Sequence, residues 1–136
     1  MKEDSVPAAP ATRVLIVEDH VESATGLCRL LTLFGYDVIM ATNGHDAVRE
    51  AIGFAPQVAL IDLTLPVLDG FNVARQLRAL RATKDCRLIA MTGWASDEYA
   101  DRARAAGFDA HLLKPISVDT LMRTLASQTA ACLAPS

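Results

Sequence analysis

Short apolar runs alternate with longer amphipathic segments along most of this 136-residue chain. The apolar runs are too short for ordinary helices and carry apolar residues at consecutive positions, which is typical of strands buried on both faces. Between them, apolar residues recur every three or four positions, as on one face of a helix. We therefore expect five strands, over residues 13–17, 36–40, 57–62, 86–92 and 109–113.

The ends of the intervening segments carry the residues expected at helix boundaries. Ser, Asp and Asn side chains accept hydrogen bonds from the free N–H groups of a first helical turn. Asn43, Asp69, Ser96 and Ser117 stand where four helices should start, and Gly70 would allow a close approach between backbone segments. We expect helices over residues 20–34, 44–54, 70–80, 97–106 and 117–130.

Strict alternation of strands and helices predicts an α/β fold in which helices cover both faces of a parallel sheet, with right-handed crossovers. The length suits one domain with a substantial core. We expect that domain over residues 13–130, a flexible N-terminal tail over residues 1–12 and a short C-terminal tail over residues 131–136.

Composition excludes several kinds of function. The formal net charge is −3, and the basic residues are interspersed with acids, so we expect no direct binding to nucleic acid. The three cysteines are widely spaced and have no metal-binding pattern, which favours a reducing cytoplasm. No stretch of the chain is long and apolar enough to indicate a membrane segment.

Polar residues follow four of the five expected strands. Glu18 and Asp19 follow the first strand, Asp62 ends the third, Thr92 ends the fourth and Lys114 follows the fifth. Sites in open parallel sheets form beyond the carboxyl ends of the strands. Three carboxylates that converge there would repel one another, and a hard divalent cation such as Mg²⁺ would relieve the repulsion.

A cation, a lysine and a hydroxyl group around one aspartate suit phosphoryl transfer, which depends on positioning and charge neutralisation. Asp62 would then be the nucleophile. Each of these residues taken alone has a simpler explanation, because turns and strand ends often expose acids and lysines. Their occurrence together at four strand ends favours a functional site.

Four motifs carry a family resemblance. They are "ED" (18–19), "DLTLPVLDG" (62–70), "MTG" (91–93) and "KP" (114–115). With these motifs in this order, the chain resembles the receiver domain of two-component response regulators from about Arg13 to Thr129. The sequence around Asp62 and Thr92 is similar to that of receivers attached to hybrid sensor histidine kinases. The resemblance implies a flavodoxin-like fold with a five-stranded sheet in the order 2-1-3-4-5.

The resemblance also implies a mechanism. A phosphohistidine of a sensor histidine kinase or histidine phosphotransfer protein would phosphorylate Asp62 transiently, with Mg²⁺ as the cofactor. Asp19, Asp62 and the backbone carbonyl of Thr64 would bind the metal directly, and Glu18 would hold a metal-bound water. The protein would catalyse only its own phosphorylation and dephosphorylation, and would not otherwise be an enzyme.

On phosphorylation, Thr92 and Lys114 would bind the new phosphoryl oxygens and draw the loop after the fourth strand inward. The peptide bond before Pro115 is expected to be cis. The signal would pass to a protein partner through the fourth helix, fifth strand and fifth helix, a face that includes Tyr99 and His111. This face would also support a phosphorylation-dependent homodimer.

Two positions depart from the family pattern. His111 replaces the aromatic residue that usually turns inward in the switch, and Trp94 stands where smaller or polar residues are common. Trp94 and Thr64 would lie at the rim of the site and set the lifetime of the phosphoryl group.

Two other functions are compatible with parts of the pattern. A phosphatase of the haloacid dehalogenase type also uses Asp, Thr and Lys around Mg²⁺. It would need a second aspartate at the position of Thr64, and a cap segment for which the chain has no insertion. A degenerate receiver that acts only as an interaction module would not need the intact set of site residues.

Overall fold

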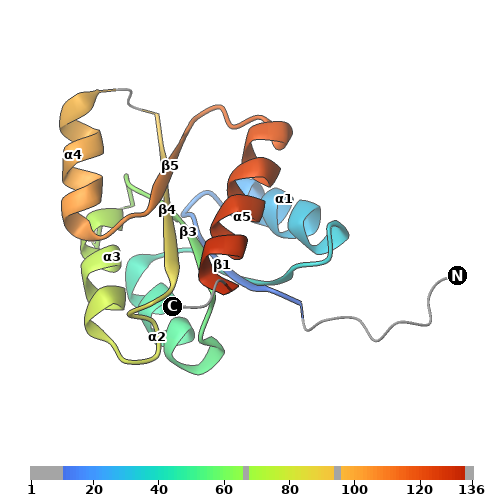
Figure 1. Ribbon diagram of the computed structural model, residues 1–136, viewed down its shortest axis with the longest axis horizontal. Coiled ribbons are helices and arrows are strands. Elements are labelled where there is room, and N and C mark those ends of the chain that lie inside the picture. Colours follow the sequence, from blue (N-terminus) through green and yellow to red (C-terminus); the bar gives the residue numbers. More distant parts are fainter. Residues whose placement is uncertain (1–10, 66–67, 94–95, 134–136) are drawn as a thin grey trace, which may run out of the picture.

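The structure of the protein is a computed structural model that describes residues 11–65, 68–93 and 96–133. Five strands and five helices alternate along these residues (Figure 1). The strands are β1 (Arg13–Val17), β2 (Asp37–Ala41), β3 (Val58–Asp62), β4 (Arg87–Thr92) and β5 (Ala110–Leu113). The helices are α1 (Val21–Leu33), α2 (Gly44–Phe54), α3 (Gly70–Ala79), α4 (Asp97–Ala106) and α5 (Val118–Leu133).

The strands form one parallel sheet in the order β2-β1-β3-β4-β5, which confirms the expected flavodoxin-like topology. Figure 1 shows α1 and α5 on one side of the sheet and α2, α3 and α4 on the other. Because every strand runs in the same direction, the carboxyl ends of β1, β3, β4 and β5 all lie at one edge. The polar residues that follow these strands therefore meet there.

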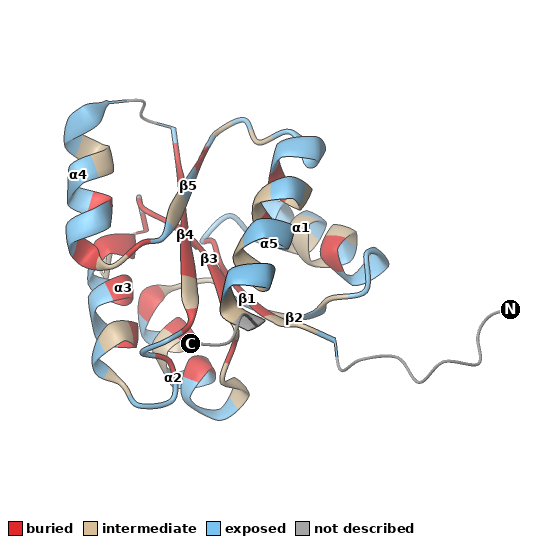
Figure 2. Ribbon diagram, in the orientation of Figure 1, coloured by how far each residue is buried: buried red, intermediate tan, exposed pale blue. Residues whose placement is uncertain are grey.

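Successive side chains along the central strands point into two separate cores. Val14 and Ile16 of β1 pack on the side of α1 and α5, where Leu31 and Leu125 are buried. Leu15 and Val17 face α2, α3 and α4, and belong to the other core. Figure 2 shows the sheet buried between helices that are each exposed on their outer side, which explains why the strand sequences are continuously apolar.

The four predicted N-caps are confirmed. In each case a side-chain oxygen accepts a hydrogen bond from the backbone N–H three residues later, which satisfies a donor that the helix itself leaves free. The distances are 2.8 Å for Asn43, 2.9 Å for Asp69, 3.2 Å for Ser96 and 3.1 Å for Ser117.

Several strand and helix boundaries differ by one residue from the sequence-based expectation, and the end of α5 differs by three; two of these differences have a clear cause. Strand β2 starts at Asp37, because the N–H of Tyr36 still bonds to the carbonyl of Leu31 and completes the end of α1. Helix α5 continues to Leu133, past the expected domain end at residue 130, because its last turn contains alanines, the strongest helix formers. The other tail residues, 1–10 and 134–136, lie outside the described residues.

No helix in the described part of the chain is long and apolar enough to cross a membrane. The three cysteines, Cys28, Cys86 and Cys132, are all unpaired thiols.

Gly70 should be needed for the loop that leaves β3. A Cβ atom at Gly70 would lie 2.4 Å from the carbonyl oxygen of Asp62 and 2.7 Å from the Cα of Leu63. Because both are backbone atoms, they cannot move aside without displacing the end of β3. We expect Gly70→Ala to reduce the free energy of unfolding by about 2 kcal/mol or more, measured by urea denaturation.

The matched control is Gly26→Ala in α1, where a new Cβ would meet nothing within 4 Å. Alanine favours a helix more than glycine does, so this variant should be as stable as the wild type or gain up to about 1 kcal/mol. Equal stability of the two variants would contradict the close approach at Gly70.

Candidate functional site

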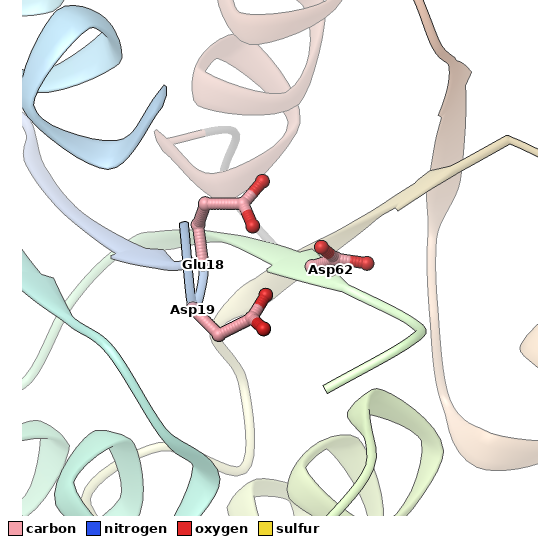
Figure 3. Close-up of side chains that lie close together, drawn as sticks. All are labelled: Glu18, Asp19 and Asp62. Atoms are coloured by element: carbon pink, nitrogen blue, oxygen red, sulfur yellow. The ribbon is translucent and has the colours of Figure 1, made fainter. Parts of the chain in front are cut away.

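Three acidic residues meet at the carboxyl edge of the sheet. Glu18 and Asp19 follow β1 and Asp62 ends β3, and one carboxylate oxygen of each lies within 4.8 Å of the others. Glu18 and Asp62 are only 4% and 2% exposed, whereas Asp19 is exposed. Figure 3 shows the three carboxylates turned toward a common space. We call Glu18, Asp19 and Asp62 the acidic trio.

Lys114 bridges the two buried acids from the end of β5. Its Nζ donates to Oε1 of Glu18 at 3.1 Å and to Oδ2 of Asp62 at 3.0 Å. The backbone N–H of Lys114 bonds to the carbonyl of Thr92 at 2.7 Å, which extends the pairing of β4 and β5 up to the site. The Lys114–Pro115 peptide bond is cis, the isomer that the resemblance implies.

The other oxygen of Asp62 is held by the loop after β3. Both the backbone N–H and the hydroxyl of Thr64 donate to Oδ1 of Asp62, each at 2.9 Å. The N–H of Leu63 bonds to the carbonyl of Met91 at 3.0 Å, so β3 and β4 remain paired just beyond Asp62. Asp62 is thus fixed by partners on both of its oxygens.

His20 supports Glu18, a role that the sequence did not reveal. Its backbone N–H donates to Oε2 of Glu18 at 3.2 Å, and its ring Nδ1 accepts from the N–H of Ser23 at 3.3 Å, which caps α1. The only signal was the position of His20, between the acid pair and the first helical turn. Histidine is not a preferred N-cap, so this signal was weak.

The environment shifts the pKa values of the two buried acids, Glu18 and Asp62, in opposite directions. Burial raises the pKa of Glu18, and the nearby Asp62 carboxylate raises it further, although the N–H of His20 and Lys114 partly oppose them. Burial also disfavours ionised Asp62, but the hydrogen bonds from Thr64 and Lys114 outweigh it, so the pKa of Asp62 is lowered. Glu18 is therefore the buried acid that takes up a proton first, while Asp62 stays ionised.

Lys114 stays charged for the complementary reason. Burial lowers the pKa of its ammonium group, but the hydrogen bonds to Asp62 and Glu18 outweigh that effect, and the pKa is raised. One positive charge thus faces three carboxyl groups. The site keeps an excess of negative charge, which favours a bound cation.

The chemistry of the acidic trio fits Mg²⁺. Mg²⁺ prefers oxygen ligands, commonly takes one or two carboxylates and keeps several waters. The trio supplies carboxylate oxygens only, from two buried residues and one exposed residue that leaves the site open to water. Within the ranges that the structure describes, no other group of three metal-ligating side chains comes this close together.

Thr92 and His111 lie beside a small pocket between α4 and β5. The pocket has a volume of about 70 Å³, and Leu63, Tyr99 and Leu113 also line it. Thr92 is 4% exposed, whereas His111 is exposed on the edge strand. The space next to Thr92 is therefore partly open.

The predicted rim residues are Thr64 and Trp94. Thr64 is exposed and donates its hydroxyl to Asp62, and its expected roles at the rim and, through its carbonyl, as a metal ligand stay predictions. Trp94 lies outside the described residues, so its expected role also stays a prediction.

A family model described as the response regulator receiver domain matches residues 14–126. The chain therefore belongs to the family of response regulator receiver domains, which are signalling domains of two-component systems and are not classed as enzymes. This confirms the resemblance found in the four sequence motifs.

Curated relatives include proteins of very different lengths. The chain is 34% identical to the virulence sensor protein BvgS of Bordetella pertussis, over 100% of this chain and 12% of BvgS. It is 33% identical to protein PilH of Pseudomonas aeruginosa, over 83% of this chain and 93% of PilH. The chain thus spans a small part of one relative and nearly the whole of another.

Among solved structures, the receiver domain of the sensor histidine kinase PA1611 of Pseudomonas aeruginosa is similar, with a TM-score of 0.81 and 31% identity. The match covers 88% of this chain and 98% of that domain, which has a magnesium ion coordinated in its active site cleft.

Mg²⁺ should stabilise the protein through the acidic trio. A ligand that binds only the folded state, present at ~100 times its dissociation constant, adds about 2.7 kcal/mol to the free energy of unfolding. We expect a saturable rise in the melting temperature as Mg²⁺ is added to chelator-treated protein. Asp19→Asn removes an exposed carboxylate and should lower the affinity for Mg²⁺ about 10-fold or more.

The control is Glu50→Gln, which removes an exposed carboxylate from α2 and should respond to Mg²⁺ like the wild type. The effect should also weaken as the pH falls, because Glu18 has a raised pKa and its protonation competes with the cation. A rise in melting temperature that is equal in Asp19→Asn would exclude the trio as the binding site.

Proposed function

We propose that the protein accepts a phosphoryl group on Asp62 from a phosphohistidine of a sensor histidine kinase or histidine phosphotransfer protein. The observation that carries this proposal is the state of Asp62: a buried, ionised carboxylate, held by Thr64 and Lys114 beside two further acids. A fixed and ionised carboxylate at an open edge is suited to act as a nucleophile.

In the transfer, a carboxylate oxygen of Asp62 attacks the phosphorus atom. The new O–P bond forms as the N–P bond to the donor imidazole breaks, and the ring nitrogen keeps the electron pair of that bond. Asp62 is already held against Lys114 and Thr64, so little reorganisation is needed before the attack.

Charge neutralisation is the second requirement. A Mg²⁺ ion bound by the acidic trio would neutralise negative charge on the transferring phosphoryl group. Asp19 and Asp62 would ligate it directly, together with the carbonyl of Thr64, and Glu18 would hold one of its waters. Lys114, now shared between Glu18 and Asp62, supplies a permanent positive charge that can bond to the phosphoryl oxygens.

Partners would recognise the phosphorylated state at the elements next to the site. Additional phosphoryl oxygens attract the Thr92 hydroxyl and Lys114, which lie at the ends of β4 and β5. The pocket beside Thr92 gives this region room to rearrange. We propose that the α4, β5 and α5 face, which includes Tyr99 and His111, then contacts a downstream protein or a second copy of the chain.

Loss of the phosphoryl group requires water to reach it. The exposed side chain of Thr64 lies at the opening, and Trp94 follows Thr92 by two positions in the sequence. We propose that these two side chains set the lifetime of the phosphoryl group. Self-catalysed phosphorylation and dephosphorylation would be the only chemistry of the protein.

The alternative functions have less support. A phosphatase of the haloacid dehalogenase type needs an acid at position 64, where Thr64 instead donates its hydroxyl to Asp62. A degenerate interaction module would not require the bridge from Lys114 to two buried acids.

We also propose where in the cell the protein acts and in what kind of protein the chain occurs. Unpaired thiols and a kinase as donor favour a cytoplasmic location, with no direct contact to nucleic acid or membrane. Its relatives are compatible both with an independent regulator and with a receiver inside a longer sensor protein.

Phosphotransfer from a panel of autophosphorylated histidine kinases tests the function. We expect the wild type to take up label only when Mg²⁺ is present, and Asp62→Asn to take up none. Asp37→Asn, which alters an exposed acid at the start of β2, serves as the matched control and should be labelled like the wild type. Equal labelling of Asp62→Asn would exclude Asp62 as the acceptor.

Amide hydrogen exchange tests the proposed output face. On phosphorylation we expect altered exchange in α4 (residues 97–106), β5 (110–113) and the first turns of α5, because Thr92 and Lys114 move toward the phosphoryl group. Exchange in α2 (residues 44–54) should not change. A response confined to α2 would show that the output face lies elsewhere.

A further inference from the structure

The last turn of α4 is fixed to the end of α3 by one arginine. Arg78 donates from Nε and Nη2 to the carbonyl of Gly107, the C-cap of α4, at 3.0 Å and 2.6 Å. Its Nη2 also donates to Oδ2 of Asp109 at 2.7 Å, and its Nη1 donates to the carbonyl of Cys86, just before β4. These charge-assisted hydrogen bonds leave the end of α4 little freedom to move.

The first turns of α4 are attached to α3 by a different contact. Cζ of Arg102, an exposed residue of α4, lies 4.2 Å from the ring centroid of Phe71 and 5.5 Å from that of Tyr99. Phe71 is buried in the first turn of α3, and Tyr99 is half-buried in the first turn of α4. We call Phe71, Tyr99 and Arg102 the aromatic cluster. Cation–π contacts of exposed side chains are weaker than a set of charge-assisted hydrogen bonds.

The aromatic cluster borders the open space beside the site. Tyr99 and Ala100 of α4 line the pocket of about 70 Å³ that Thr92 and His111 also line. Figure 1 shows α3 and α4 side by side on one face of the sheet. The first turns of α4 therefore have room to move, whereas its last turn is held by Arg78.

We propose that Arg102 is a positioning residue of the phosphorylation switch. In the unphosphorylated protein, its contact with Phe71 and Tyr99 holds the first turns of α4 against α3, and Arg78 makes the last turn a fixed pivot. On phosphorylation, the first turns of α4 leave this position and the aromatic cluster opens. The proposal rests on the proposed function, because phosphorylation of Asp62 is what displaces α4.

The contact of Arg102 should oppose activation. A contact that exists only in the unphosphorylated position adds its free energy to the equilibrium between the two positions of α4. Its loss shifts the population toward the displaced position, even without a phosphoryl group. By linkage, a ligand that favours the displaced position then binds more tightly.

Beryllofluoride is a suitable probe, because it binds an aspartate carboxylate reversibly as a mimic of a phosphoryl group. By titration calorimetry with Mg²⁺ present, we expect Arg102→Ala to bind beryllofluoride about 2- to 5-fold more tightly than the wild type. This change corresponds to the loss of one cation–π contact. Arg102→Lys keeps a positive charge near the rings and should have an intermediate affinity. A substitution that only loosened the fold would weaken binding instead.

The matched control is Arg104→Ala. Arg104 is an exposed arginine of the same helix that pairs with Asp101 instead of an aromatic ring. This variant should bind beryllofluoride with the affinity of the wild type.

Amide hydrogen exchange without beryllofluoride locates the pivot. In Arg102→Ala, exchange should become faster over residues 97–102, the first turns of α4. It should stay unchanged at Gly107 and Phe108, whose N–H groups bond to the carbonyls of Arg104 and Ala103 and close the last turn beside Arg78. Faster exchange along the whole of α4 would contradict a fixed pivot.

The binding experiment separates this inference from the proposed function. Equal or weaker binding by Arg102→Ala, with normal binding by the wild type, would overturn the role of Arg102 and leave the proposed function intact. If the wild type itself bound no beryllofluoride, the proposed function would be contradicted, and this inference with it.

Discussion

Two buried carboxylates share one ammonium group at the carboxyl edge of the sheet, and the rest of the site depends on this bridge. Glu18 follows β1, Asp62 ends the neighbouring strand β3, and Lys114 reaches both from the end of β5. Buried like charges without a partner would be unfavourable, so strands that are far apart in sequence must end together. The strand order 2-1-3-4-5 satisfies this requirement. It also leaves the site negative, open and able to bind a cation.

Features with a local cause could be predicted from the sequence. Continuous apolar runs defined the strands, capping side chains defined the starts of helices, and the strand ends defined the acidic trio and Lys114. Features that depend on distant partners could not. His20 supports Glu18 through its backbone, which any residue could do. Arg78 bonds to the carbonyl of Gly107 and to Asp109, and no local pattern predicts that contact. The end of α5 was placed too early for a different, local reason, because the alanines of its last turn favour a helix.

The ends of two strands connect the site to the face where we place contacts with partners. Strand β4 ends at Thr92, and Lys114 lies between β5 and α5. A phosphoryl group would draw the Thr92 hydroxyl and the Lys114 ammonium group inward. That movement would change the face formed by α4, β5 and α5.

Mapping the phosphoryl bond tests the central claim most directly. Hydride reduction converts an aspartyl phosphate into homoserine, which marks the modified position permanently for peptide sequencing. After phosphotransfer in the presence of Mg²⁺, the account predicts homoserine at position 62 and nowhere else in the chain. Homoserine at Asp19, or label that resists reduction and stays on a histidine, would contradict it.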